Sequence, residues 1–276
     1  MPPIASRHFR ARTGAVAACL AGLSIFALTA PASAQVSVHY VASNYVALGD
    51  SYSAGVGAGS YSGGGCDRSA HAFPVLWAKA NDPGSFSNET CSGATTANVL
   101  ARQLSVLSDG TTLVSITIGG NDVGFASVMI TCVIFSTSAC TSAVSVAEAQ
   151  MSSQLPGKLN HVLAAVGKHA PNAKVIVLGY PDLYDLSRSS GCIGLSTTDR
   201  TDLNQAADQL DAQIRAAAGR YHDVFADVRP AFAGHEICDA SSWLYSVNWF
   251  DLSISYHPTA SGQSGAYEPV FAAAAG

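Results

Sequence analysis

Short apolar runs alternate along this chain with longer segments in which apolar residues recur at helical spacing. Runs rich in β-branched and apolar residues predict buried strands at 45–48, 112–118, 174–178 and 224–228. A further short strand is expected at 85–89. Continuous apolar runs of this length are typical of parallel strands that are covered on both faces.

Helical periodicity covers the segments 72–80, 99–107, 142–169, 197–218 and a terminal segment reaching Ala273. A proline–glycine pair at 156–157 interrupts the third segment and predicts a helix pair or a kinked helix. Thr197 or Thr198 is the expected N-cap of the fourth segment, and Thr259 or Ser261 that of the last. Strands alternating with helices predict an α/β fold, a three-layer α/β/α sandwich with a mostly parallel central sheet.

The composition describes a globular protein with a large core. Hydrophobic residues make up 48% of the 276 residues and charged residues only 12%. This balance excludes a disordered chain, and the absence of a basic cluster beyond the N-terminus gives nucleic-acid binding no electrostatic support.

The N-terminus has the pattern of a secretory signal peptide. Arg7, Arg10 and Arg12 precede an apolar run at 15–30, and an Ala-x-Ala site ends at Ala34. We therefore expect a signal peptide at 1–34, a single mature domain at 35–276 and a secreted protein. Losing the three arginines takes the formal net charge from −5 to −8.

Two other interpretations of the N-terminus are less well supported by its pattern. A retained membrane anchor is disfavoured because the apolar run is short and ends at a good cleavage site. The residues 16–19 resemble a lipoprotein signal, but the apolar run continues well past Cys19.

An even number of cysteines remains once the signal peptide is removed: Cys66, Cys91, Cys132, Cys140, Cys192 and Cys238. In an exported chain six cysteines suggest three disulfides, for which 15 pairings exist. Sequential pairing is the simplest because each bond then closes a local loop. Zinc is disfavoured, since the spacings contain no Cys-x-x-Cys.

Polar residues follow several predicted strands at the point where each strand ends. Ser51 follows the strand at 45–48, Gly93 lies in a small-residue turn, and Asn121 follows the strand at 112–118. Because ligands bind outside the carboxyl ends of parallel strands, we expect these residues to share a site, with His257 as a fourth member. Singly, each has a structural explanation, such as a turn or a helix cap.

The glycine-rich loop at 55–65 allows positive φ angles and close backbone approach to a ligand. Its G-x-G-x-G spacing, without a following helix, does not fit a dinucleotide-binding loop.

The ordered motifs resemble those of the SGNH, or GDSL-type, hydrolase superfamily, most of all the secreted three-disulfide esterases and lipases of actinobacteria. The matching blocks are Gly-Asp-Ser-Tyr-Ser at 49–53, Gly93, Gly-Gly-Asn-Asp at 119–122, and His257 before Pro258. The resemblance implies a flavodoxin-like fold, a nucleophile at Ser51, a base at His257, and an oxyanion hole that includes Gly93 and Asn121. It implies no cofactor and no metal.

One position departs from the family pattern. The common last block carries an aspartate three residues before the histidine, where this chain has Ile254. Some relatives use a backbone carbonyl instead, so we expect the carbonyl of Ile254 or Ser255 to orient His257. Asp251 is the alternative.

The expected substrates are lipid or fatty-acyl esters, with phospholipids and acetylated carbohydrates as alternatives. Aromatic residues in predicted loops fit an acyl chain near the surface, although each can equally be ordinary packing: Tyr52, Tyr61, Phe125, Trp243, Tyr245, Trp249 and Phe250. An acyltransferase and a non-catalytic binding protein on the same fold are the rival functions. We expect a monomer without a stable membrane anchor that binds a small-molecule ester or lipid.

Overall fold

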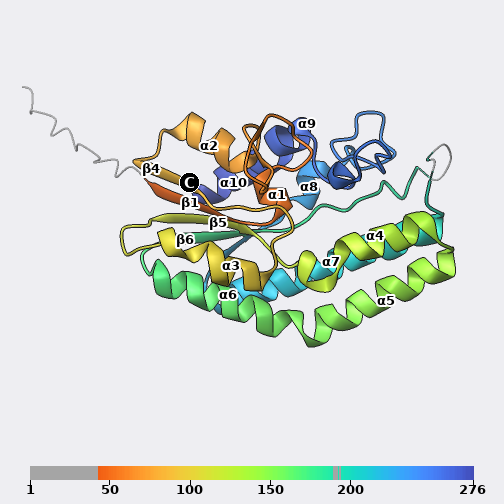
Figure 1. Cartoon of the computed structure of the whole chain (residues 1–276), viewed down its shortest axis with the longest axis horizontal. Coiled ribbons are helices and arrows are strands. Elements are labelled where there is room, and N and C mark those ends of the chain that lie inside the picture. The colour runs from red at the N-terminus through yellow and green to blue at the C-terminus, as the bar shows by residue number, and fades with distance from the viewer. Residues whose placement is uncertain (1–42, 189–191, 193) are drawn as a thin grey trace, which may run out of the picture. The chain divides into compact units, whose positions relative to one another are not determined.

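The computed structural model describes residues 43–188, 192 and 194–276, so the predicted signal peptide and residues 35–42 lie outside it. Within the described residues, five strands form one parallel sheet in the order β4-β1-β5-β6-β7 (Figure 1). Their bounds are β1 Asn44–Gly49, β4 Ser85–Asn88, β5 Leu113–Thr117, β6 Lys174–Leu178 and β7 Val224–Ala226. The predicted parallel sheet is confirmed.

Helices cover both faces of the sheet, as the α/β/α prediction requires. On one face lie α2 (Phe73–Asn81) and α10 (Glu268–Ala275), and on the other α3 (Thr96–Arg102), α6 (Leu155–His169) and α7 (Thr197–Arg220) (Figure 1). The helix α5 (Thr137–Ser153) packs outside against α7. Burial of these apolar helix faces against the β-branched strands forms the core.

The remaining elements are short: α1 (Ser51–Ala54), α4 (Phe125–Ile134), α8 (Arg229–Phe232), α9 (Ala260–Gly262), the antiparallel pair β2 (Tyr61–Ser62) and β3 (Arg68–Ser69), 3₁₀ turns at Leu104–Val106, Asn121–Val123 and Leu252–Ile254, and a π-helical turn at Gln263–Tyr267. In the part of the chain that is described, no helix is both long and apolar enough to cross a bilayer.

Some predicted elements differ in detail from the observed ones. The interruption at 156–157 separates two helices, because Pro156 lies in the first turn of α6. The N-cap of α7 is Ser196, whose hydroxyl forms a capping box with Asp199, rather than Thr197 or Thr198. Thr259 caps the terminal helical segment as expected.

Helix α4 was not predicted, and Phe125, which was assigned to a loop, is its first residue. The segment is mostly apolar, with Ser127 and Thr131 as its polar residues, and carries no side-chain cap, so neither a clear periodicity nor a start signal marks it. Packing against α5 and a disulfide between the two helices stabilise it instead.

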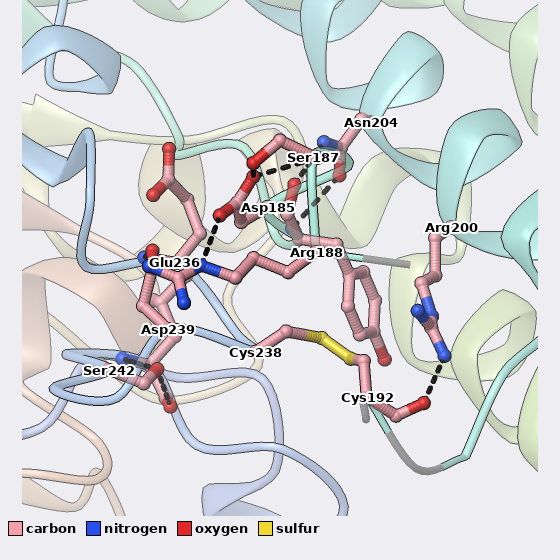
Figure 2. The surroundings of a disulfide bond; sticks show 12 residues. Asp185, Ser187, Arg188, Cys192, Arg200, Asn204, Glu236, Cys238, Asp239 and Ser242 are labelled. Atoms are coloured by element: carbon pink, nitrogen blue, oxygen red, sulfur yellow. Dashed lines mark hydrogen bonds and ion pairs between the residues drawn. A yellow bond between two sulfur atoms is a disulfide. The ribbon is translucent and has the colours of Figure 1, made fainter. Parts of the chain in front are cut away.

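Three disulfides pair the cysteines sequentially, as the simplest pairing predicted: Cys66–Cys91, Cys132–Cys140 and Cys192–Cys238. The first ties the glycine-rich loop to the turn before Gly93, and the second ties α4 to α5. The third joins the segment that follows β6 to the segment that follows α8, beside an ion pair between Arg188 and Asp239 (Figure 2).

Candidate active site

Ser51 is the first residue of α1, directly after β1. Asp50 caps this helix by accepting a hydrogen bond from the Tyr52 N–H at 3.1 Å. Gly49 has a φ of +120°, and a Cβ there would lie 2.4 Å from the carbonyl oxygen of Thr117. A glycine is therefore required at the point where β1 turns sharply and presents Ser51 at the carboxyl edge of the sheet.

Asp50 is buried and anchored to β5 and to the segment after β6. Its carboxylate accepts hydrogen bonds from the Thr117 hydroxyl at 2.8 Å and from the Tyr180 hydroxyl. Burial raises the pKa of Asp50 to about 6, although both hydrogen bonds favour the ionised form and oppose the shift. Asp50, directly before Ser51, is thus held by hydrogen bonds from the carboxyl ends of the neighbouring strands β5 and β6.

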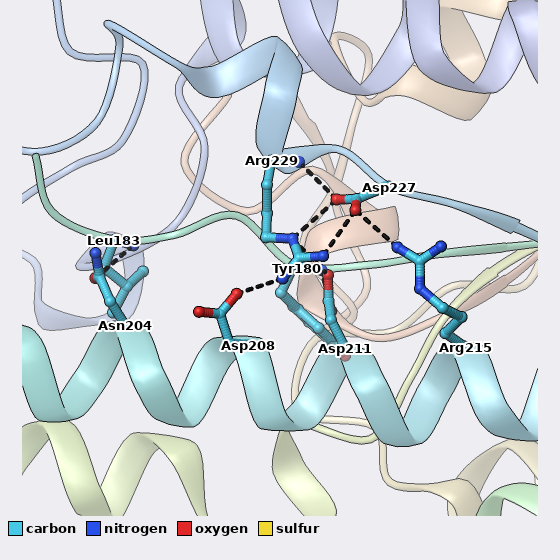
Figure 3. A network of polar contacts seen from close by, with 8 residues as sticks. All are labelled: Tyr180, Leu183, Asn204, Asp208, Asp211, Arg215, Asp227 and Arg229. Carbon is cyan, nitrogen blue, oxygen red and sulfur yellow. Dashed lines mark hydrogen bonds and ion pairs between the residues drawn. The ribbon is translucent and has the colours of Figure 1, made fainter.

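Sequence reasoning did not single out Tyr180, which connects two loops of the site. Its hydroxyl donates to Asp50 and accepts the Gly120 N–H at 3.3 Å. Its backbone N–H donates to Asp211 at 2.8 Å, and Arg229 holds that carboxylate in the network of Figure 3. The signal that could have found Tyr180 is its place at the carboxyl end of β6, the same position that drew attention to Ser51 and Asn121.

The structure brings His257 to Ser51 from 206 residues away, with Nε2 2.7 Å from the serine Oγ. Nδ1 lies 3.0 Å from the carbonyl oxygen of Ser255. A carbonyl only accepts, so Nδ1 carries the proton and Nε2 is free to accept from the serine hydroxyl. Burial lowers the pKa of His257 to about 4, which keeps the ring neutral near pH 7.

Of the two backbone carbonyls expected to orient His257, those of Ile254 and Ser255, the Ser255 carbonyl is the one that accepts from Nδ1. The alternative, Asp251, accepts instead from the N–H and hydroxyl of Ser253, at 3.1 and 2.5 Å. Its carboxylate has no hydrogen bond to His257 in the described structure.

The glycine-rich loop packs against the histidine segment. A Cβ at Gly57 would lie 2.6 Å from the carbonyl oxygen of Pro258 and 3.3 Å from the Cβ of His257. The close backbone approach seen at Gly57 is therefore to the residues around His257, whereas the sequence predicted an approach to a ligand.

Gly93 and Asn121 lie on the same cavity as Ser51 and His257. The Asn121 side-chain amide donates to the Ala94 carbonyl at 3.0 Å, which fixes the amide beside the Gly93 turn. Neither the Ser51 N–H nor the Gly93 N–H has an acceptor within the described residues. All four predicted site residues thus line one cavity.

The cavity has a volume of about 430 Å³ and is mostly apolar. It extends from Ser51 and His257 between three helices, lined by Val128 and Met129 of α4, Ala147 and Met151 of α5, and Ala206 and Leu210 of α7. Such a site suits a flexible apolar chain with its polar end at Ser51. Across the described residues, His, Cys, Asp and Glu side chains form no group of three that could hold a metal.

The seven aromatic residues predicted to lie in loops differ in whether they line the cavity. Tyr52, Phe125 and Trp249 line the cavity, whereas Tyr61, Trp243, Tyr245 and Phe250 do not. Trp243 stacks on His235 with ring centroids 3.6 Å apart, which is ordinary packing.

Known proteins match this chain over most of its length. The model of the GDSL-like Lipase/Acylhydrolase family matches residues 47–264. Lipase 1 of Streptomyces coelicolor is 54% identical over 251 residues, which are 90% of this chain and 93% of the relative.

Two crystal structures share the architecture. Phospholipase A1 of Streptomyces albidoflavus has a TM-score of 0.82 at 51% identity, over 84% of this chain and 99% of that one. The extracellular lipase of Streptomyces rimosus has a TM-score of 0.82 at 47% identity, over 84% of this chain and 100% of that one. The chain therefore belongs to the GDSL-like lipase and acylhydrolase family.

Proposed function

We propose that this family member hydrolyses fatty-acyl esters through a Ser51–His257 dyad. The supporting observation is the 2.7 Å contact between His257 Nε2 and Ser51 Oγ, in the tautomer that lets Nε2 accept the serine proton. Ser51 attacks the ester carbonyl, and His257 takes its proton. His257 then protonates the leaving alcohol. In the second half of the reaction His257 takes a proton from water, the water attacks the acyl-enzyme carbonyl, and the proton returns to the Ser51 oxygen as the acid is released.

The backbone N–H groups of Ser51 and Gly93 and the side-chain amide of Asn121 are the proposed oxyanion-hole donors. Two of them lack acceptors in the described structure, and the third is fixed by its bond to Ala94. Donors held in place in this way cost no reorganisation when negative charge develops on the carbonyl oxygen.

The apolar cavity supports a fatty-acyl group rather than an acetyl group as the substrate's acid part. A cavity of about 430 Å³ between α4, α5 and α7 is larger than an acetyl group needs. Phospholipids are included in this proposal, because a relative 51% identical is named a phospholipase A1 and a phospholipid is itself a fatty-acyl ester.

The test is hydrolysis of p-nitrophenyl esters from acetate to palmitate by wild type and Ser51→Ala. We expect wild type to prefer longer chains than acetate and Ser51→Ala to be at background on every ester. Equal activity of the two proteins would refute the proposed nucleophile. A fluorophosphonate probe should label wild type and leave Ser51→Ala unlabelled, which separates a hydrolase from an inert binding protein.

We propose further that the protein is secreted as a monomer after cleavage behind Ala34. The N-terminal arginines, apolar run and Ala-x-Ala site support export, as do the disulfides of the described chain. Mass spectrometry of protein from the culture medium should find Gln35 as the first residue, and sedimentation should give the mass of one chain.

A further inference from the structure

Tyr256, the residue between Ser255 and His257, has an unusual backbone conformation. Its φ is +62°, in the left-handed region that bulky residues rarely adopt. The side chain is nevertheless buried, so the surrounding structure must hold this conformation in place.

Three hydrogen bonds hold Tyr256. Its N–H donates to the Tyr245 carbonyl at 3.0 Å, and its hydroxyl accepts from Tyr184 at 3.2 Å. Its carbonyl accepts from the Tyr52 hydroxyl at 2.6 Å, across 204 residues. The Tyr52 contact is the shortest of the three and comes from the residue directly after Ser51.

The left-handed turn has a direct consequence for His257. The Ser255 carbonyl that accepts from His257 Nδ1 at 3.0 Å is only two residues away in the chain. Tyr256 lies between the two residues, so its backbone angles set where the Ser255 carbonyl stands relative to the His257 side chain. The conformation of Tyr256 thus contributes to the orientation of the imidazole.

We propose that the Tyr52 hydroxyl is a positioning group that holds the Tyr256 turn, and through it His257, aligned with Ser51; this inference rests on the proposed function. The Ser255 carbonyl takes the place of the aspartate that position 254 lacks, and Tyr52 supports the turn that presents this carbonyl. The place of Tyr52 beside the nucleophile in the chain couples Ser51 and His257, and its ring also packs on the imidazole with centroids 5.2 Å apart.

The test compares Tyr52→Phe with Tyr267→Phe. Both tyrosines are buried and donate to a backbone carbonyl, Tyr267 to Gly179 at 2.9 Å, so both variants lose one buried hydrogen bond and should melt at similarly lowered temperatures. Misplacement of a catalytic group by about 1 Å can cost on the order of 100-fold in rate. We expect Tyr52→Phe to lose roughly 10- to 100-fold in kcat at nearly unchanged KM, and Tyr267→Phe to keep kcat.

Labelling of Ser51 by a fluorophosphonate should slow in parallel with kcat in Tyr52→Phe, because it also needs the aligned base. Unchanged kcat in Tyr52→Phe, or an equal loss in both variants, would overturn the positioning role. Wild type without esterase activity would instead refute the proposed function, so the two failures are distinguishable.

A second pair of variants tests the turn if Tyr52→Phe does not fold. Glycine adopts the φ of Tyr256 without strain and alanine does not, while both lose the same ring. Tyr256→Gly should therefore keep a kcat several-fold above that of Tyr256→Ala. Equal kcat values would show that the left-handed turn has no part in positioning His257.

Discussion

The Asp122 carboxylate accepts hydrogen bonds from the backbone N–H of Thr96 at 2.8 Å and from its hydroxyl at 2.7 Å. Thr96 begins α3, three residues after Gly93. Asp122 follows Asn121, so this pair of bonds joins the two loops that carry the proposed oxyanion-hole donors.

Asp122→Ala should therefore weaken catalysis without removing any donor. We expect kcat on p-nitrophenyl butyrate to fall about 10- to 100-fold, because the Gly93 and Asn121 loops lose their fixed spacing, with KM nearly unchanged. The control is Asp199→Ala, which removes a capping-box carboxylate at the start of α7. An equal loss of kcat in the control would show that the effect is general destabilisation.

Asp251→Asn should leave kcat within about twofold of wild type. The Asp251 carboxylate is exposed and binds Ser253, and His257 is oriented by the Ser255 carbonyl. Steady-state kinetics decide this: a loss approaching that of His257→Ala would restore a Ser-His-Asp triad.

The acid limb of the pH profile should lie unusually low for a histidine base. Burial lowers the pKa of His257 to about 4, so the ring is protonated and inactive below that pH and neutral above it. We expect kcat/KM to rise with pH and reach half its plateau near pH 4. A midpoint near the ordinary histidine pKa of about 6.5 would mean that the ring is solvated in the free enzyme.

Ala206→Leu should shorten the acyl chain that the enzyme accepts. Leu203, Ala206 and Leu210 of α7 all line the cavity. Because an α-helix rises about 1.5 Å per residue, this lining runs roughly 10 Å along α7. Its Leu210 end lies beside Gly119, close to the site. Added methyl groups at Ala206 fill this space. Hydrolysis of the palmitate ester should fall at least tenfold relative to the butyrate ester. Each methylene group that can no longer be buried in the cavity loses about 0.8 kcal/mol of binding, and only the long chain has methylene groups that reach this part of the cavity.

The matched control is Ala212→Leu, an exposed position on the same helix. It should leave the ratio of palmitate to butyrate hydrolysis unchanged. If Ala206→Leu also leaves the ratio unchanged, the acyl chain does not enter the space between α4, α5 and α7.

The fold class and the members of the site could be predicted because both depend on local patterns. Apolar runs of five or so residues form parallel strands, and a polar residue directly after such a run must lie at the carboxyl edge of the sheet. Ser51 and Asn121 were found in this way. Helix α4 was not, because a mostly apolar segment without a cap carries little periodic signal, and packing against α5 stabilises it instead.

The amino-acid sequence by itself determined the parallel sheet, the even number of cysteines in the predicted mature chain and the absence of an aspartate at position 254. Only the tertiary structure decided which cysteines pair, and that the Ser255 carbonyl rather than Asp251 accepts from His257. It also decided that the hydroxyls of Tyr52 and Tyr180 donate to the Tyr256 carbonyl and to Asp50. The reason is physical: the two tyrosine contacts join residues 204 and 130 positions apart through single hydroxyl groups. Such contacts leave no periodic trace in the chain, and they exist only once the strands have brought the loops together.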